Sequence, residues 1–414
     1  MNWDTGRITL GGFLAYFVMS AIISPLGVIS APIATYYDIS TTTATATFTY
    51  LTTGILIGTL VAIFIFDFFR LKQVVIGGVI LIVTCIYAIY AIRIFSVFSV
   101  SLGLIGIGCG IELSAAAVVI SKSYADKMRA SMLLLTDSFY SIAGVLSTAL
   151  AGWFIAREYH WSSAYLLATL ASVVIAGLAL SSKYPDTEVD AFETQGTNLA
   201  PDNVTPEGIA DAWEQINEES LLANENWPVS VHLVGVAMLV YLIGFVSIYS
   251  WVPNYAQETF GVSVESSGIV VSRFFLGMII GQLVMFFLVL KFPLRNLIII
   301  YAILATLFTI LLWLVETADH LQLAMLTLGL ATGGLFKTVL TFGTTVVNNP
   351  SPKMVSYLIF HAGFGTAIAP FISSFIVESW DMSAALQLVS VCYGLMVVLL
   401  LLSFMYQPTT SVRA

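Results

Sequence analysis

The chain has 414 residues, of which 58% are hydrophobic and only 9% are charged. A soluble domain draws roughly a quarter of its residues from Asp, Glu, Lys and Arg, so this composition excludes an ordinary water-soluble globule and predicts a membrane protein. A net charge of -9 leaves no basic surface to neutralise phosphates, which excludes a nucleic-acid binder. The three cysteines lie in apolar runs without ligand neighbours, so neither a disulfide framework nor a metal site is expected.

Long apolar runs divide the chain into predicted membrane spans. A hydrocarbon core about 30 Å thick needs roughly 20 apolar residues per helix. Twelve such runs predict an all-α membrane protein with two pseudo-symmetric six-helix bundles. The first run is longer than the apolar part of a signal peptide, so we expect it to be retained. The predicted spans lie near residues 8–35, 44–66, 73–91, 95–120, 131–156, 162–181, 229–256, 264–290, 295–315, 321–347, 354–377 and 383–406.

An acidic segment separates the sixth span from the seventh. Residues 182–228 hold eleven acidic residues against Lys183 alone. This composition favours a solvated cytoplasmic linker, and the alternative is a docking segment for a regulatory partner. The sequence therefore predicts an N-terminal bundle over 1–181 and a C-terminal bundle over 229–414. A short helix is predicted in the linker around 206–224.

The basic residues predict the orientation of the chain. With a cytoplasmic amino terminus, eleven of them lie on the inner side, and only Arg93 and Arg157 lie outside. Cytoplasmic loops are enriched in Lys and Arg, so we expect a multi-pass protein of the bacterial inner membrane with both termini in the cytoplasm. The inner residues are Arg7, Arg70, Lys72, Lys122, Lys127, Arg129, Lys183, Lys291, Arg295, Lys353 and Arg413.

Glycine motifs repeat between the two halves. GxxxG occurs in the second, fourth, eighth and tenth spans, which are corresponding members of the two predicted bundles. Glycine at this spacing lets membrane helices approach closely. The repetition favours paired bundles of the kind found in transporters with internal repeats. The motifs are Gly54–Gly58, Gly106–Gly110, Gly277–Gly281 and Gly329–Gly333.

Two acidic residues are predicted to lie at membrane depth. Counting about 1.5 Å per residue from the cytoplasmic charges places Glu112 roughly 15 Å deep and Asp137 roughly 12 Å deep. Ionisable groups at such depth usually face a cavity or a partner. Two carboxylates that meet do not readily ionise together, so we expect one of them to carry a proton. The alternative for Asp137 is a hydrogen-bonded acid close to the inner headgroups.

Two basic residues are candidates for substrate binding. Lys337 lies roughly 16 Å deep, close to the depth of Glu112, and we predict that the two pair or alternate between pairing and substrate binding. The alternative for Lys337 is snorkelling toward water. Arg273, in the outer half of its span, is a candidate for an outer gate or for binding a substrate anion, against interface packing. Its depth disfavours a pair with Asp137.

Further candidates for substrate binding are His361, Tyr140, Trp251 and Asn254. His361 titrates near neutrality unless it is a satisfied buried imidazole. The other three are candidates for lining a polar pocket, and the alternative for the aromatic residues is packing. No Walker loop or hydrolase motif occurs at a useful location, so we expect no enzyme, and uphill transport would draw on an ion gradient.

Four segments resemble a known family: LLLTDSFYSIAG (133–144), SWVPNYA (250–256), GIVVSR (268–273) and PSPK (350–353). They are similar to the major facilitator superfamily, and more narrowly to the TsgA-like proteins related to the fucose/galactose/glucose:proton symporter group. The resemblance extends from Arg7 to about Tyr406. The run CGIELSAA (109–116) looks like the run that holds the transport carboxylate of the sugar symporters, which implies that role for Glu112. The chain departs from those relatives at Tyr140, where they have asparagine, and at Lys337, where they have proline.

These observations predict a secondary active transporter of a small polar, sugar-like solute that is coupled to protons and works by alternating access. One alternative is an exporter of a small or anionic compound, with Lys337 and Arg273 as the attracting charges. An alternative of another class is a non-transporting membrane sensor or scaffold that uses the acidic linker. We expect a monomer whose partners are a small-molecule substrate, protons and the lipid bilayer, without cofactor or metal.

Overall fold

The computed structural model describes residues 3–124, 126–184, 227–347 and 352–406. All regular structure in these ranges is helical, and they contain no strand. Most of the acidic linker lies outside the described residues, and so does the helix predicted at 206–224. The bundle boundaries at the linker therefore stay a prediction.

Twelve helical segments of the described chain are long and apolar enough to cross a membrane, which confirms the predicted all-α membrane fold. We call α1–α7 the first bundle and α10–α16 the second bundle. The first contains α1 (Trp3–Ile23), α2 (Leu26–Tyr37), α3 (Thr41–Phe68), α4 (Leu71–Ala91), α5 (Phe95–Ser123), α6 (Asp126–Ala156), η1 (Trp161–Tyr165) and α7 (Leu166–Ser181). The second contains α10 (Val229–Phe260), α11 (Val264–Val289), α12 (Leu294–Leu311), α13 (Ala318–Thr332), α14 (Leu335–Thr345), α15 (Pro352–Ser379) and α16 (Met382–Met405).

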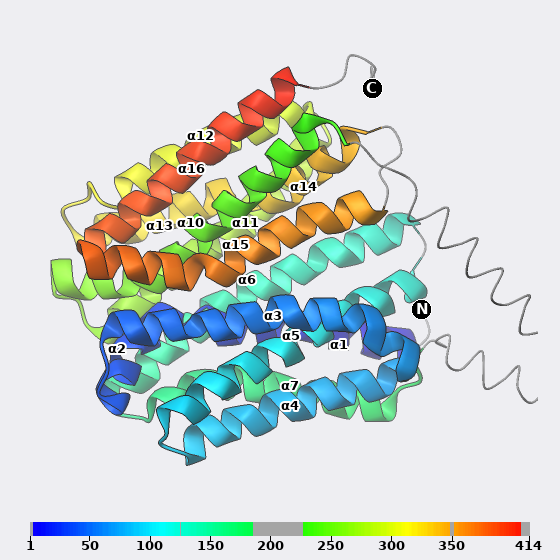
Figure 1. The fold of residues 1–414 in the computed structure, drawn as a ribbon, viewed down its shortest axis with the longest axis horizontal. Helices are drawn as coiled ribbons and strands as arrows, with labels where there is room; N and C mark the ends of the chain where they lie inside the picture. The colour runs from blue at the N-terminus through cyan, green and yellow to red at the C-terminus, as the bar shows by residue number, and fades with distance from the viewer. Residues whose placement is uncertain (1–2, 125, 185–226, 348–351, 407–414) are drawn as a thin grey trace, which may run out of the picture.

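The helices run roughly side by side, with the first bundle below the second in Figure 1. The start of α1 and the end of α16 lie at the same end of the molecule, which also holds the end of α7 and the start of α10. We call this the linker end and the opposite one the far end. Several helices that start at the far end have an N-cap side chain that accepts a backbone N–H, which fixes where they begin. These caps are Ser40, Ser263, Thr317 and Asp381.

The predicted glycine motifs lie at close helix contacts within each bundle. In the first bundle, α3 packs on α5, and a Cβ atom on Gly54 would collide with the carbonyl oxygen of Gly103. In the second bundle, α11 packs on α13, and a Cβ on Gly277 would collide with the carbonyl oxygen of Leu326. Corresponding helix pairs thus meet backbone to backbone, as small residues allow in membranes.

Two of the twelve spans are broken helices. Span one is divided between α1 and α2 at Ser24 and Pro25, where proline supplies no N–H to the preceding turn. Span ten, expected as one run, is divided between α13 and α14 at Gly333 and Gly334. Gly334 has a φ of 83°, a left-handed conformation that glycine adopts without steric cost. The second break places the start of α14 deep inside the protein.

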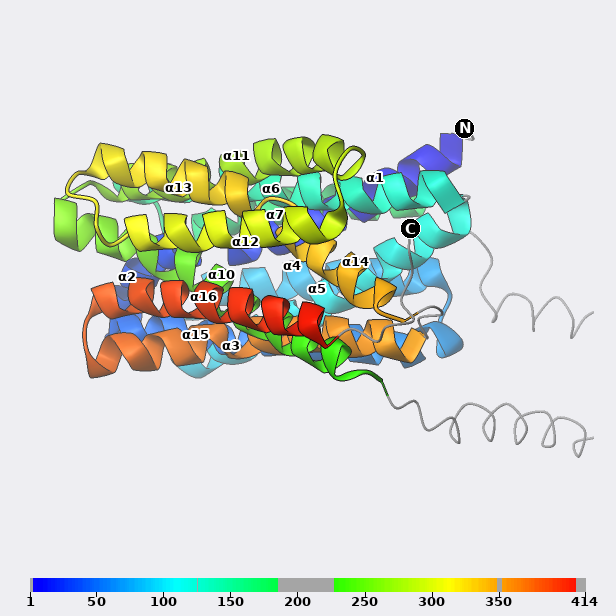
Figure 2. The ribbon, with the colours of Figure 1, turned by 90° about the horizontal axis from the view of Figure 1, so that it is seen from above.

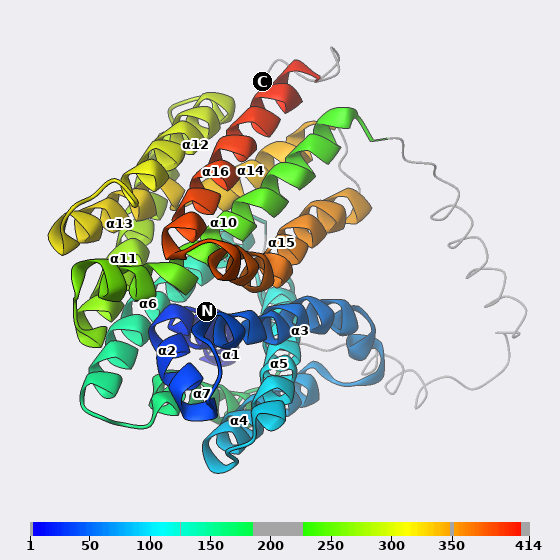
Figure 3. The same ribbon diagram turned by 60° about the vertical axis from the view of Figure 1, so that its left-hand side comes forward.

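The two bundles meet mainly where α6 packs on α11, α3 on α15 and α2 on α10, with a smaller contact between α2 and α11. Figure 3 shows these contacts between the lower and upper groups of helices. By contrast, α14 packs against α10, α12, α13 and α15, all members of its own bundle. The joined faces therefore surround a region that α6 approaches from one bundle and α14 from the other.

Candidate functional site

An ion pair joins the two bundles at membrane depth. The Lys337 Nζ of α14 lies 3.5 Å from the Asp137 Oδ1 of α6. The side chains remain 32% and 26% exposed, so the space around them is not filled by protein. The predicted pairing of Lys337 with Glu112 is wrong. The prediction assumed that Glu112 faces the second bundle, whereas it faces Gly78 of α4 within the first bundle. Lys337 lies on α14, the separate helix that follows the break at Gly334.

Asp137 lies at one end of a stripe of small and polar residues on α6. Positions 137, 141, 144, 148 and 152 follow helical spacing and face the second bundle. The Gln282 Nε2 of α11 donates to the Ser141 Oγ at 3.2 Å, and that hydroxyl donates to the backbone oxygen of Asp137 at 3.0 Å. Asp137 therefore lies one turn beyond the last hydrogen bond that joins this stripe to α11.

Aromatic side chains surround the ion pair. Tyr16 of α1 interacts electrostatically with both charges. Tyr140 of α6 contacts the ring of Phe275 of α11, with 6.2 Å between centroids, and Tyr249 of α10 contacts the same ring at 6.3 Å. Phe275 and Tyr249 are fully buried, whereas Tyr16 and Tyr140 are partly exposed and place phenol groups close to the charge of Asp137.

Two of the aromatic residues near the pair, Tyr16 and Tyr241, had no signal in the sequence. Each is a tyrosine in an apolar run, and such residues are usually packing in membrane helices. Tyr241 of α10 is buried, interacts electrostatically with Asp137 and contacts the ring of Tyr393 at 5.4 Å. Only the three-dimensional approach of α1, α6 and α10 distinguishes them.

Glu112 lies elsewhere, inside the first bundle. It is 3% exposed and faces α4, where a Cβ on Gly78 would come within 2.5 Å of the Glu112 Oε1. That oxygen is buried and has no hydrogen-bond partner among the described residues. Tyr184, after the end of α7, is close enough to interact with it electrostatically. The carboxyl group is therefore separated from Lys337 and enclosed between α4 and α5.

Trp251 and Asn254 lie in the far-end half of α10. Trp251 is fully buried, and its Nε1 has no partner within the described part of the chain. Asn254 donates from Nδ2 to the Ser30 Oγ of α2 at 2.9 Å and so joins the two bundles. Both side chains are therefore buried among helices near the far end, and neither contacts the ion pair.

His361 and Arg273 also lie away from the ion pair. His361 packs between α15 and α10, with its Nδ1 2.9 Å from the backbone oxygen of Tyr357 in the preceding turn. This bond satisfies one ring nitrogen, as expected for a structural imidazole. Arg273 is exposed on the outer face of α11. Of the eight predicted site residues, Asp137 and Lys337 are in contact, and Tyr140 lies beside them.

The α6–α11 contact is closely packed from the far end to Ser141. A Cβ on Gly268 would collide with the carbonyl oxygen of Thr148. The hydroxyls of Thr148 and Ser272 are hydrogen-bonded at 2.8 Å, and the Ser272 Oγ also approaches the backbone oxygen of Val145 at 2.8 Å. We call this contact the seam. In the seam the backbones of the two helices are in close contact.

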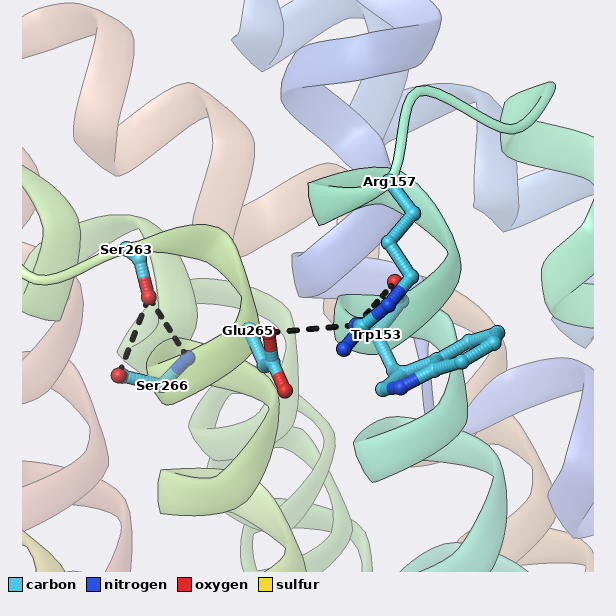
Figure 4. A network of polar contacts seen from close by, with 5 residues as sticks. All are labelled: Trp153, Arg157, Ser263, Glu265 and Ser266. Atoms are coloured by element: carbon cyan, nitrogen blue, oxygen red, sulfur yellow. Dashed lines mark hydrogen bonds and ion pairs between the residues drawn. The ribbon is translucent and has the colours of Figure 1, made fainter.

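An exposed ion pair lies at the far-end margin of the seam (Figure 4). Arg157 of α6 approaches the Glu265 Oε2 of α11 at 3.4 Å, with exposed fractions of 45% and 41%. The Arg157 guanidinium also lies 4.1 Å from the ring centroid of Trp153. A pair this exposed contributes about 0–1 kcal/mol, so close packing and not this pair holds the seam together.

A groove of about 680 Å³ lies between α3 and α5, with Phe371 of α15 at its edge. Its lining includes Tyr50, Val100 and Leu104, which are exposed on the outer surface. It contains none of the predicted site residues and no Asp, Glu, Lys or Arg. We therefore take the region around Lys337 and Asp137 as the candidate functional site.

The chain is similar to curated bacterial proteins over nearly its full length. It is 28% identical over 385 residues to the Protein TsgA homolog of Yersinia enterocolitica serotype O:8 / biotype 1B (strain NCTC 13174 / 8081), which covers 93% of this chain and 92% of that protein. It is also 28% identical over 399 residues to the Protein TsgA homolog of Serratia proteamaculans (strain 568), covering 96% and 95%. The resemblance stated from the sequence is confirmed.

Solved structures share the fold. A D-xylose-proton symporter superposes with a TM-score of 0.74 at 13% identity, over 99% of each chain. A mutant of the nucleoside transporter NupG gives 0.70 at 12% identity, over 98% of this chain and 100% of that one. A family model described as Major Facilitator Superfamily matches residues 8–350 and 233–414. The chain therefore belongs to the Major Facilitator Superfamily and is a multi-pass membrane transporter, not an enzyme.

Proposed function

We propose that this protein transports a small polar, sugar-like solute together with protons, and that Asp137 and Lys337 couple the two. The observation that supports this most is the partly exposed ion pair between α6 and α14, because it joins the two bundles that must move in alternating access. Both charges lie at membrane depth, where ionisable groups are usually functional.

In this mechanism Asp137 exchanges its partner. While it is ionised it pairs with Lys337, and the pair holds α14 near α6. When water delivers a proton to the Asp137 carboxylate, the attraction to Lys337 is lost, and the lysine N–H groups become available to oxygen atoms of the solute. Separation of the bundles then opens the seam at the far end, and release of the proton on the other side restores the pair.

The surroundings of the pair support a sugar-like solute. Partly exposed ring faces such as those of Tyr16 and Tyr140, both close to Asp137, can pack against the apolar faces of a sugar or a base, while phenolic hydroxyls bind its polar edge. Two proteins of the same fold are described as a nucleoside transporter and a D-xylose-proton symporter, which supports the same class of cargo.

Glu112 enters the proposal as a second proton-binding group. The resemblance to the sugar symporters implies a transport carboxylate at this position. Because the group is enclosed between α4 and α5, it exchanges a proton only when those helices or Tyr184 move. We expect Glu112→Gln to change the pH profile of transport, and Asp137→Asn to remove proton coupling altogether.

We further propose that the linker end faces the cytoplasm of a bacterial inner membrane and that the protein acts as a monomer. The distribution of basic residues supports the orientation. With this orientation the structure is closed on the outer side by the seam. Asp137 and Lys337 then exchange protons and solute with the cytoplasmic side in this state.

The experiment uses purified full-length protein in liposomes with an imposed proton gradient and a panel of radiolabelled sugars, nucleosides and organic acids. We expect gradient-driven accumulation of a neutral sugar or nucleoside. Asp137→Asn should abolish accumulation while it retains exchange of solute between the two sides. The matched control is Asp319→Asn, because Asp319 is exposed at the start of α13, at the far end of the molecule.

Three outcomes contradict the proposal in different parts. Accumulation that is unchanged in Asp137→Asn removes this residue from coupling. Uptake that is indifferent to the gradient in the unmodified protein removes proton coupling itself. If only organic anions are transported, the cargo is an anionic compound, as in the exporter alternative, and not a sugar-like solute.

A further inference from the structure

Arg273 places a full positive charge on the outer surface of the second bundle. It shares an exposed stripe of α11 with Ile269 and Ile280, which are four residues before and seven residues after it. The other side of the helix holds Phe274 and Met278, which are buried. Because residues at this spacing lie on one helix face, Arg273 points toward lipid and away from the protein interior.

The neighbours of α11 leave this stripe uncovered. Figures 2 and 3 show α11 at the edge of the molecule beside α6 and α13. It packs on α6 through Gly268 and Ser272 and on α13 through Gly277, and these two contact faces flank the stripe. Hydrocarbon or headgroups of the membrane therefore surround Arg273.

Arg273 lies in the far-end half of its span. It lies nine residues after Val264, where α11 begins, or about 14 Å along a helix axis. Side chains of a helix tilt toward its N-terminus, which for α11 is the far end. A long basic side chain extends to reach polar surroundings, so the guanidinium rises toward the headgroups of the far-end leaflet.

The chain itself supplies no counter-charge. Lys337 has Asp137, whereas no hydrogen bond or ion pair within the described ranges involves Arg273. Away from the helix ends, the acids of the described spans are Glu112, which is enclosed, and Asp137, which is paired. A second copy of this chain therefore offers no acid at that depth on a lipid-facing surface. Since an unpaired charge in the membrane is costly, the partner has to come from the bilayer.

The surface between Arg273 and the far end is electrically neutral. Glu265 lies on the same stripe two turns closer to the far end, but it is already paired with Arg157. Trp153, 37% exposed, lies beside this pair, at the level where aromatic residues contact headgroups. Arg273 therefore adds one positive charge without a counter-charge, deeper in the membrane than the neutral Arg157–Glu265 pair.

We propose that Arg273 binds the phosphate of an anionic phospholipid of the far-end leaflet. A guanidinium offers parallel N–H donors that match phosphate oxygens, which a lysine ammonium does not. Lipid phosphates are the anions that a bilayer holds at the level the side chain reaches. The lipid then lies on the outer margin of the seam. The proposal is independent of the transported solute and of proton coupling.

The experiment measures lipid binding to the full-length protein by native mass spectrometry. Delipidated protein is titrated with phosphatidylglycerol and, separately, with phosphatidylcholine of identical acyl chains. We expect the unmodified protein to bind phosphatidylglycerol about five-fold more tightly. Arg273→Gln should reduce this ratio to about one, and Arg273→Lys should keep part of it because the charge remains. The matched control Arg93→Gln changes another far-end arginine, whose partner is the backbone oxygen of Tyr36 and not an acid, and it should keep the full ratio.

Two outcomes overturn the proposal. One is an unchanged preference in Arg273→Gln, provided that variant elutes and melts like the unmodified protein. The other is a dimer that forms without added lipid and is lost in Arg273→Gln, because a second copy would then occupy the stripe. If Arg273→Gln does not fold, Arg273→Lys decides: a full five-fold ratio rejects paired donation by the guanidinium, and a reduced ratio supports it.

Discussion

The seam and the ion-pair site are neighbouring parts of the same bundle interface, yet they are built in opposite ways. In the seam, backbones meet through Gly268 and Gly152, and short hydroxyl side chains bond across at 2.8 Å. One helical turn beyond Ser141, contact passes to two long charged side chains, Asp137 and Lys337, which keep a quarter to a third of their surface exposed.

This difference indicates that the seam is the part that opens and closes, and that the ion pair is the part that responds to proton and solute. Contact between two backbones is lost when they move apart by a few tenths of an ångström. The seam is therefore either closed or fully open. A pair of flexible charged side chains tolerates small movements and responds to proton and solute instead. Four substitutions, ordered by expected effect, test this contrast.

The largest effect is expected for Gly268→Leu. The new side chain meets the backbone of Thr148 and forces α6 and α11 apart, so the far end cannot close and transport stops. An engineered cysteine at the far end should then react with a membrane-impermeant thiol reagent under all conditions, because the far end stays open. Gly177→Leu is the control, because a Cβ there meets no atom within 4 Å. Normal far-end closure in Gly268→Leu would contradict the role of the seam.

The next effect is expected for Lys337→Met, which leaves Asp137 without its counter-ion. A fully buried pair costs about 3–5 kcal/mol when one partner is removed, and partial exposure reduces this to about 2 kcal/mol. The melting temperature in detergent should fall, and the double variant Lys337→Met, Asp137→Asn should recover most of it. If the double variant is as unstable as the single one, the two side chains are not energetically coupled.

A smaller effect is expected for Thr148→Val, which keeps the shape of the seam and removes its hydroxyl bond to Ser272. The loss should be about 1 kcal/mol, since Ser272 retains backbone acceptors. Melting temperature and the fraction of far-end-closed protein report it. An effect as large as that of Gly268→Leu would mean that hydrogen bonds, and not close packing, hold the seam.

The smallest effect is expected for Arg157→Gln at the far-end margin. The pair with Glu265 is exposed on both sides, so its loss should change stability by about 0.5 kcal/mol or less and transport little. High salt should have the same small effect on the unmodified protein. A strong transport defect would show that this margin contributes more to closure than its exposure indicates.

The fold was predictable because its signals are local. Apolar runs defined the twelve spans, and the GxxxG spacing marked the helices that approach most closely. The depth estimates singled out Asp137 and Lys337, which the structure brings together, but they paired Lys337 with Glu112. Depth fixes height along the membrane and not direction, and Glu112 faces α4 instead of the second bundle.

The surroundings of the pair were less predictable. Tyr16 and Tyr241 approach Asp137 only because α1, α6 and α10 converge, and nothing in their own segments distinguishes them from packing residues. The polarity of Asn254 indicated a site, whereas its amide joins α10 to Ser30 of α2. The functional roles of all the candidate residues stay predictions until they are tested.

The division of span ten makes the two bundles mechanically unequal. The equivalent span four, α5, is one continuous helix, whereas Lys337 lies on a separate short helix that follows Gly334 and packs on four helices of its own bundle. A short helix of this kind can move on a hinge without rotating the rest of its bundle. Solute binding would then involve a local movement of α14, and transport across the membrane would involve a slower rigid-body movement of the bundles. Binding and translocation would therefore have separate rates.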